Sequence, residues 1–260
     1  MNGVLRLVLA YDGTDFRGFA RQPGERTVQG VLEEALARVL GMAPRLSVAG
    51  RTDAGVHAEG QVVSFGADLD PERVQRSVNG MLAPEVVVVR AERAPRGFDA
   101  RRSATAREYR YRIRTGAVPR PFTARYEWHR PGEYGLGRMR RAARLLEGEH
   151  DFASFCRAAG VTRSTVRTLE RLSVQREGEV VEVRARAGSF LHQMVRSLVG
   201  TLVAVGDGKM APDSMPEVLE ARSRAAAGPV APPHGLALVR VVYGRKPSRP
   251  AETLRRGDRS

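Results

Sequence analysis

The sequence predicts an α+β protein with two ferredoxin-like, RRM-like halves, whose antiparallel sheets are joined around a central basic cleft. Two observations lead to this fold class. The order strand, helix, strand, strand, helix, strand is found in residues 1–103, and a similar order recurs in residues 104–244. The formal net charge of +14 predicts the basic character of the cleft.

The elements of the first half are predicted from apolar periodicity and from capping residues. Thr27 is expected to cap a helix that ends at Gly41. Asp70 and Pro71 have the residue types that begin a second helix. The predicted elements are a strand at 4–11 that ends in a turn at 12–14, a helix at 28–40, strands at 46–49 and 61–65, a helix from 71, and a strand at 86–91.

A similar order follows in the second half. Gly178 lies in a hairpin-like turn, and Ser189 is expected to cap a long apolar helix that runs to about Val205. The predicted elements are a strand at 105–114, a helix at 136–146, strands at 167–176 and 180–187, helices at 190–205 and 216–222, and a strand at 236–243. The basic, proline-containing tail at 245–260 is expected to be disordered.

Composition limits the kinds of protein that this chain can be. Apolar residues make up 42% of the 260 residues, yet no apolar run reaches the roughly 18 residues that a membrane span needs. Residues 1–9 are typical of a strand rather than of a signal peptide. Because Cys156 is the single cysteine, an internal disulfide and a zinc site with several thiolates are excluded. These features favour a cytoplasmic protein with no membrane partner.

The positive charge points to a polyanionic partner, most simply nucleic acid, because each neutralised phosphate releases counterions. Lysine occurs only at Lys209 and Lys246, so arginine carries nearly all of this charge. Arginine suits bidentate phosphate contacts and stacking on bases. A GC-rich genome also explains the ratio of arginine to lysine, but it does not explain the excess of positive over negative charge.

Asp53 is the first candidate for chemistry. It lies in the glycine-flanked run from Gly50 to His57, two residues after Arg51. Aspartate is common in turns because its side chain accepts backbone hydrogen bonds. An adjacent cation, however, favours the charged form of a carboxylate, which is the form that a nucleophile needs.

Tyr109 and Arg196 are the second and third candidates. In a strand, Tyr109 and Tyr111 share one face while Arg110 and Arg112 share the other. A tyrosine in this setting suits stacking on an unpaired base, or alternatively packs into a half-buried sheet. Arg196 lies in an otherwise apolar helix and needs a carboxylate partner if it is buried, for which Asp53 is the candidate. The alternative is that Arg196 extends to the helix surface.

His57 and His192 are interpreted as structural or substrate-edge polar groups rather than as acid–base catalysts. The sequence contains no metal-ligand spacing, phosphate-binding loop, dinucleotide glycine fingerprint or Gly-x-Ser-x-Gly elbow. No metal and no cofactor are therefore expected.

Taken together, these segments closely resemble the TruA-type tRNA pseudouridine synthases, and the resemblance runs from near the N-terminus to Tyr243. The string from Gly50 to His57 is the most specific part. The matching segments are 11–13, 21–22, 50–57, 61–63, 103–111, 151–155, 190–196 and 235–239.

The resemblance implies the pseudouridine-synthase fold and an enzyme that isomerises uridine to pseudouridine at positions 38 to 40 in the anticodon stem-loop of tRNA. It implies that Asp53 is the nucleophile, that Tyr109 lies on the target base and that Arg196 pairs with Asp53. Arg51 corresponds to a residue that helps to flip or hold the nucleotide. It also implies a homodimer and no cofactor or required metal. The further residues expected to contact substrate are Arg21, Gln22, His57 and Leu236.

Two departures from the family pattern concern loops away from Asp53. Phe19 stands where the family usually has tryptophan, and Ala83 is an extra residue before Pro84 in the Asn-x-x-Leu-Pro motif. The sequence leaves open whether Asp53 attacks the ribose C1′ or the uracil C6. It also leaves a rival function, an RNA-binding protein that uses the same basic sheets without catalysis.

Overall fold

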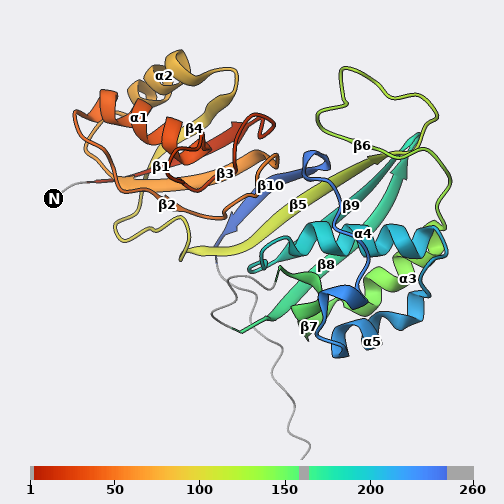
Figure 1. Ribbon diagram of the computed structural model, residues 1–260. Coiled ribbons are helices and arrows are strands. Elements are labelled where there is room, and N and C mark those ends of the chain that lie inside the picture. The colour runs from red at the N-terminus through yellow and green to blue at the C-terminus, as the bar shows by residue number, and fades with distance from the viewer. Residues whose placement is uncertain (1–2, 158–163, 245–260) are drawn as a thin grey trace, which may run out of the picture.

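The computed structural model describes residues 3–157 and 164–244 of the chain (Figure 1). The predicted tail at 245–260 lies outside the described residues. The strands are β1 (Val4–Tyr11), β2 (Ser47–Val48), β3 (His57–Gly66), β4 (Val86–Ala94), β5 (Ala104–Arg114), β6 (Trp128–His129), β7 (Gly148–Asp151), β8 (Val166–Glu177), β9 (Val180–Ala187) and β10 (Leu236–Tyr243). The α-helices are α1 (Val28–Leu40), α2 (Pro71–Leu82), α3 (Leu136–Leu146), α4 (Met194–Gly206) and α5 (Met215–Glu220), and the 3₁₀ helices are η1 (Ala153–Phe155), η2 (Pro212–Ser214), η3 (Arg224–Ala226) and η4 (Pro233–Gly235).

Within the described residues, ten strands form one mixed sheet in the order β4-β1-β3-β10-β5-β9-β8-β7, with β2 beside β3 and β6 beside β5. The first half contributes β4-β1-β3-β2 and the second contributes β10-β5-β9-β8, so each half has the ferredoxin-like arrangement that the sequence predicts. Helices α1 and α2 pack on the first half, and α3, α4 and α5 pack on the second (Figure 1).

The structure differs from the sequence prediction in that the two sheets are continuous. Strand β10, from the end of the described chain, pairs in parallel with the beginning of β3 and antiparallel with β5. Leu238 lies opposite both Ala58 on β3 and Tyr109 on β5. This pairing supplies partners to backbone groups that would otherwise lie on two open sheet edges. It also brings Tyr109 to within two strands of the Asp53 turn.

The predicted helix caps are confirmed in the first half. The Thr27 hydroxyl accepts a hydrogen bond from the Gly30 amide over 3.2 Å, and α1 ends at Gly41 in the left-handed conformation with φ of 75°. Asp70 accepts from the amide of Arg73 over 3.0 Å at the beginning of α2. These local contacts satisfy amides and carbonyls at the helix ends that have no partner within the helix.

The predicted start of the long apolar helix is wrong. Helix α4 begins at Met194, and Gln193 before it has a left-handed backbone with φ of 61°, so Ser189 does not cap it. The reason is tertiary packing. Phe190 turns toward β5 and places its ring edge-on to Tyr109, 5.1 Å between centroids. The apolar residues continue through this break, so periodicity alone does not reveal it.

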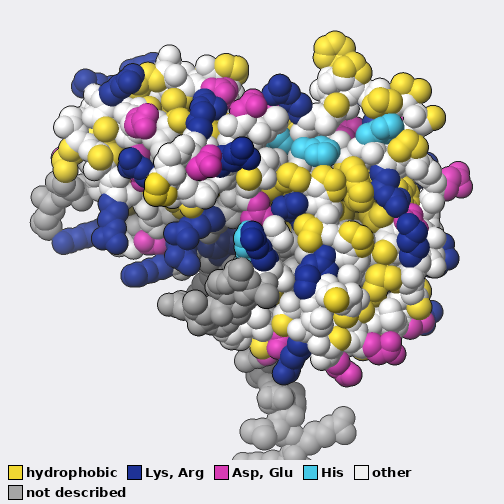
Figure 2. Space-filling model, viewed as in Figure 1, with side chains coloured by type: hydrophobic (Ala, Val, Ile, Leu, Met, Phe, Trp, Pro, Cys, Tyr) yellow, Lys and Arg dark blue, Asp and Glu magenta, His cyan; other side chains and the backbone are white. Residues whose placement is uncertain are grey.

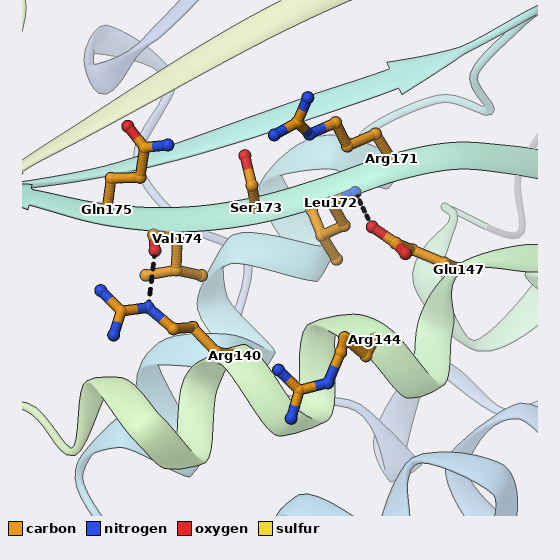
Figure 3. A pocket seen from close by; sticks show the side chains of 8 residues that line it. All are labelled: Arg140, Arg144, Glu147, Arg171, Leu172, Ser173, Val174 and Gln175. Carbon is orange, nitrogen blue, oxygen red and sulfur yellow. Dashed lines mark hydrogen bonds between the residues drawn. The ribbon is translucent and has the colours of Figure 1, made fainter.

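Side chains bond backbone groups on the outer strand β4 and on the part of β8 that extends past β7. On β8, Glu147 accepts from the Leu172 amide over 2.7 Å and Arg140 donates to the Val174 carbonyl over 3.0 Å, as Figure 3 shows. On β4, the Asn79 amide group accepts from the Val88 amide over 2.7 Å and donates to its carbonyl over 3.0 Å. These contacts occupy backbone groups that could otherwise pair with a strand of another molecule.

Helix α4 is the central buried helix of the second half, and Arg196 is its one residue that is not buried. The segment before η4 crosses this helix at Gly200, where an added Cβ would lie 1.6 Å from the Pro229 carbonyl oxygen. The hydroxyl of Thr201 accepts from the Gly228 amide over 2.9 Å and holds the crossing in place. Only glycine permits so close an approach of two backbones.

Gly200→Ala is therefore expected to destabilise the fold by about 1–3 kcal/mol or more, because the crossing segment must move away from α4. Gly137→Ala on α3 is the matched control, since its added Cβ meets nothing within 4 Å. That change is expected to stabilise the protein by about 0.5–1 kcal/mol through helix propensity. Urea unfolding of both variants measures the difference. Equal stability of the two variants would contradict the packing described for Gly200.

Candidate active site

The Asp53 turn connects β2 to β3, and buried polar contacts hold it in place. The hydroxyls of Tyr11 and Thr52 lie 2.8 Å apart, and the Thr52 carbonyl accepts from the Phe19 amide over 3.0 Å. Phe19, which replaces the usual tryptophan, is fully buried beneath the turn. Gln61 is also fully buried and bonds Gly50 twice: its amide donates to the Gly50 carbonyl over 2.5 Å and accepts from the Gly50 amide over 3.3 Å.

Asp53 meets two side chains from the second half of the chain. Its Oδ2 lies 3.2 Å from Nη1 of Arg196 on α4, and its Oδ1 lies 3.4 Å from Nε2 of His192. Nε of Arg196 donates to the Ala231 carbonyl over 2.8 Å, which fixes the direction of the guanidinium. The side chains of Asp53 and Arg196 are only 21% and 13% exposed. The Asp53 carboxylate is therefore fixed in place and paired with a positive charge, yet it is still accessible from the cleft.

Tyr109 lies on β5 near this carboxylate. Its side chain is buried, with Phe190 edge-on to the ring and Gly50 of the turn beside the phenol oxygen. Burial raises the pKa of the Tyr109 phenol above its usual value, so the hydroxyl is protonated at neutral pH. Tyr111 shares this face of β5 but packs inside, where its hydroxyl donates to the Pro232 carbonyl over 2.8 Å. Of the two tyrosines, Tyr109 lines the cleft.

The arginines that alternate with these tyrosines point to the opposite face of the sheet. Arg110 forms ion pairs with Glu59 and Glu182, and Arg112 bonds Glu127 over 2.8 Å. They do not flank Tyr109 within the cleft. Arg107 is instead on the Tyr109 face, is buried, and donates to the carbonyls of Ala49, Gly188 and Arg101 at distances from 2.6 to 3.0 Å. Its guanidinium thus joins the strand before the Asp53 turn to the end of β9.

A cleft of about 1330 Å³ opens between the two halves above Asp53 and Tyr109. Among the described residues that line it, eight are arginines and three are carboxylates. Figure 2 shows arginine side chains gathered along the lower side of the first half. The carboxylates of the cleft are Glu25, Asp53 and Asp99, and the arginines are Arg17, Arg45, Arg51, Arg101, Arg102, Arg107, Arg157 and Arg196.

The other predicted contact residues divide into two groups. Arg51, Gln22 and Leu236 line the cleft, and the Arg51 side chain is exposed there. Arg21 and His57 do not line it. Arg21 forms an ion pair with Glu33 of α1 over 3.4 Å, outside the cleft.

His57 lies behind the Asp53 turn rather than in the cleft. Its Nδ1 accepts from the Gly13 amide over 3.0 Å, and its ring meets Tyr126 edge-on at 5.0 Å. Burial lowers the pKa of His57, so the neutral ring is favoured. Within the string from Gly50 to His57, Asp53 therefore faces the cleft and His57 packs behind the turn. The residue pattern of the string does not distinguish these two positions.

The sequence does not predict a role for Gln61 or Arg107, and it predicts only a structural or substrate-edge role for His192. A glutamine in the apolar strand β3 is an available signal, because a fully buried amide group needs hydrogen-bond partners. The contact of His192 with Asp53 has no such signal, since it depends on the irregular backbone before α4.

In the described parts of the chain, no three or more histidine, cysteine or acidic side chains are grouped as a metal site would require. Of the helices in those parts, none is long and apolar enough to cross a membrane.

Two ferredoxin-like halves, an arginine-lined cleft between them and a fixed carboxylate within it suit an enzyme that modifies RNA. The family model described as tRNA pseudouridine synthase matches residues 7–101 and 142–244 of this chain. The chain belongs to this family, whose members are isomerases that convert uridine to pseudouridine in tRNA.

Proteins of the same family from several bacteria are similar to this chain over nearly their whole length. The tRNA pseudouridine synthase A of Geobacillus kaustophilus is 43% identical over 247 residues, which cover 94% of this chain and 95% of the relative. That of Methylobacterium sp. strain 4-46 is 46% identical over 241 residues, or 92% and 96% of the two chains. A solved H/ACA RNP bound to a substrate RNA containing 2′-deoxyuridine is more distant, with 16% identity and a TM-score of 0.31 over 77% of this chain and 53% of that one.

Proposed function

We propose that this protein isomerises uridine to pseudouridine at positions 38 to 40 in the anticodon stem-loop of tRNA, with Asp53 as the nucleophile. The observation that carries the proposal is the pairing of Asp53, from a turn of the first half, with Arg196 of the second half over 3.2 Å within a basic cleft. A protein that only binds RNA gains nothing from a fixed carboxylate in its phosphate groove. A glycosidic isomerase needs one.

The target uridine leaves the base stack and enters the cleft, where the ring of Tyr109 supports its base. Asp53 then either bonds to the ribose C1′ as the bond from C1′ to N1 breaks, or adds to the uracil C6 as the C5–C6 double bond is lost; both routes use the same carboxylate. Arg196 supplies the counter-charge and aims the carboxylate. Arg51, exposed on the same turn, helps to flip or hold the nucleotide. The detached uracil must be confined while it rotates, which favours a cleft with walls from both halves.

Tyr109→Phe is expected to retain most of the activity, because stacking on the base requires only the ring. Tyr109→Ala is expected to weaken binding of the target by roughly 5- to 150-fold, the range of one base–aromatic stack of about 1–3 kcal/mol. Steady-state kinetics on tRNA, together with thermal unfolding to confirm that both variants fold, measure the difference. If the phenylalanine variant is as inactive as the alanine variant, the hydroxyl has a chemical role and stacking alone is insufficient.

The proposal extends to the organisation of the protein. We assign residues 1–103 to a half that carries the Asp53 turn, residues 104–244 to a half that carries Tyr109 and Arg196, and residues 245–260 to a basic tail. The enzyme acts in the cytoplasm as a homodimer whose two subunits hold one tRNA arm. Sedimentation with and without tRNA tests the dimer, for which a monomer in both conditions is the contrary result.

Pseudouridine mapping in tRNA from cells with and without this protein tests the function directly. Loss of pseudouridine at positions 38 to 40, with the other pseudouridines retained, is the expected result. Purified protein should restore those positions in the unmodified tRNA. Binding of tRNA without formation of pseudouridine would favour the rival function of an RNA-binding protein.

A further inference from the structure

The reaction requires a proton acceptor in addition to a nucleophile. In uridine, N1 of uracil is bonded to the ribose and C5 carries a hydrogen. In pseudouridine, C5 is bonded to the ribose and N1 carries a hydrogen. When the new bond from C1′ to C5 has formed, the C5–H bond must therefore break, its electron pair must return to the ring, and N1 must gain a proton. Some group near Asp53 has to accept the proton that leaves C5.

The carboxylates of the cleft other than Asp53 are engaged elsewhere. Asp99 accepts from the backbone amides of Arg101 over 2.9 Å and Arg102 over 2.7 Å. Burial acts to raise the pKa of Asp99, but hydrogen bonds from Arg102 and Ser47 bring it below its usual value. Asp99 is thus a weak base.

Three further candidates in the cleft are no better placed. Glu25 forms an ion pair with Arg17 over 3.5 Å, and both side chains are largely exposed. Tyr109 is a protonated phenol at neutral pH, because burial raises its pKa. Asp53 is still bonded to C6 in one route; in the other it is released when C5 bonds to C1′, and it is then again paired with Arg196 over 3.2 Å. None of these groups is both free and basic at neutral pH.

His192 is the one imidazole among the described residues that line the cleft. Its Nε2 lies 3.4 Å from Oδ1 of Asp53. Arg196 contacts the other carboxylate oxygen, Oδ2. The side chain is 49% exposed, so a proton that it accepts can pass to solvent. An imidazole nitrogen can accept a proton and later donate it, which suits proton transfer in both directions.

The backbone holds His192 in this position. Its carbonyl accepts from the Arg157 amide over 3.2 Å, and the next residue, Gln193, has the left-handed φ of 61° that turns the chain into α4. Non-glycine residues rarely adopt this conformation, and such residues cluster at functional sites. The turn places Phe190 against Tyr109 and His192 against Asp53. One short segment therefore contacts both the tyrosine that supports the target base and the carboxylate.

We propose that neutral His192 accepts the proton that leaves C5 of the rotated uracil, an inference that rests on Asp53 being the nucleophile of the proposed function. The C5–H electron pair restores the double bond of the ring, and the imidazolium gives its proton to solvent. Solvent supplies the proton that N1 gains. No oxidant or reductant takes part, and the product is an isomer of the substrate.

The test compares wild-type protein with His192→Asn and His192→Ala on tRNA whose target uridine carries hydrogen or deuterium at C5. We expect the kcat of both variants to fall by about 10²-fold or more, with little change in KM. A primary deuterium isotope effect should emerge in the variants, because loss of the C5 proton becomes rate-limiting. Added imidazole should restore part of the activity of His192→Ala, since the site is open to solvent. His150→Asn, on β7 outside the cleft, is the control and should retain wild-type kcat.

Two results would overturn the proposal for His192. One is a kcat within a few-fold of wild type in both variants. The other is a loss of kcat that shows no isotope effect and no rescue by imidazole, which indicates a structural role. Failure of the proposed function is distinguished from both, because the wild-type protein itself would then form no pseudouridine.

Discussion

Replacing Asp53 with asparagine is expected to abolish pseudouridine formation while tRNA binding is retained. Asparagine has nearly the same shape and keeps a carbonyl oxygen toward Arg196, so the turn should be preserved. It cannot form the covalent bond of a charged carboxylate, and loss of a nucleophile typically lowers kcat by roughly 10⁴-fold or more. Single-turnover assays with enzyme in excess measure the chemical step without contributions from product release.

Glu25→Gln is the matched control for this prediction. It removes the same charge from the same cleft, but Glu25 lies in an ion pair with Arg17 and not with Arg196. Its effect on the single-turnover rate should be small. If Asp53→Asn forms pseudouridine at the normal rate, the assignment of the nucleophile is wrong. A variant that no longer binds tRNA would indicate that Asp53 serves the structure of the cleft.

Arg196→Ala is expected to have the second largest effect, a loss of roughly 10²- to 10³-fold in kcat with a smaller change in KM. The arginine supplies the charged partner of Asp53 over 3.2 Å and is tied to the Ala231 carbonyl through Nε. Its removal leaves a mostly buried carboxylate without this ion pair, with His192 still in contact. The carboxylate is then less well aimed at the ribose.

Arg196→Lys distinguishes charge from geometry. Lysine keeps the positive charge but lacks the planar guanidinium with which arginine contacts Asp53 and the Ala231 carbonyl at the same time. We expect activity between those of the wild type and Arg196→Ala. Full activity of the lysine variant would show that charge alone is sufficient, and wild-type activity of Arg196→Ala would contradict the role given to the ion pair. Urea unfolding separates these effects from loss of the fold.

Much of the fold can be predicted because its elements carry local signals. The bounds of β1, α1, α3, β9 and β10 follow from alternation, periodicity and caps, and the structure confirms them. The pairing of β10 with β3 has no local signal, since it joins segments from the two halves of the chain. Strand β7 is not predicted, because its sequence, Gly-Glu-His-Asp, lacks the apolar alternation of a strand. The beginning of α4 is predicted too early because apolar residues continue through the left-handed Gln193.

The candidate site shows the same division. A lone arginine in an apolar helix needs a carboxylate if it is buried, and this requirement links Arg196 to Asp53 from the residue types alone. Tyr109 is assigned through the family resemblance. The positions of His57 behind the turn and of His192 beside Asp53 depend on tertiary packing, which places His57 outside the cleft. The charged pair can therefore be predicted from the sequence, and its surroundings are set by the fold.

The most direct test of the nucleophile is to locate the covalent bond between enzyme and RNA. Fluorine in place of hydrogen at C5 of the target uridine makes C5 a weaker nucleophile and cannot leave as a proton, so the bond from the enzyme to C1′ or C6 should persist. Proteolysis of the trapped complex and mass spectrometry then identify the modified peptide. We predict a nucleotide adduct on Asp53, absent from Asp53→Asn and present in Glu25→Gln. An adduct on Asp99 or Glu25, or one that persists in Asp53→Asn, would contradict the assignment of Asp53 as the nucleophile.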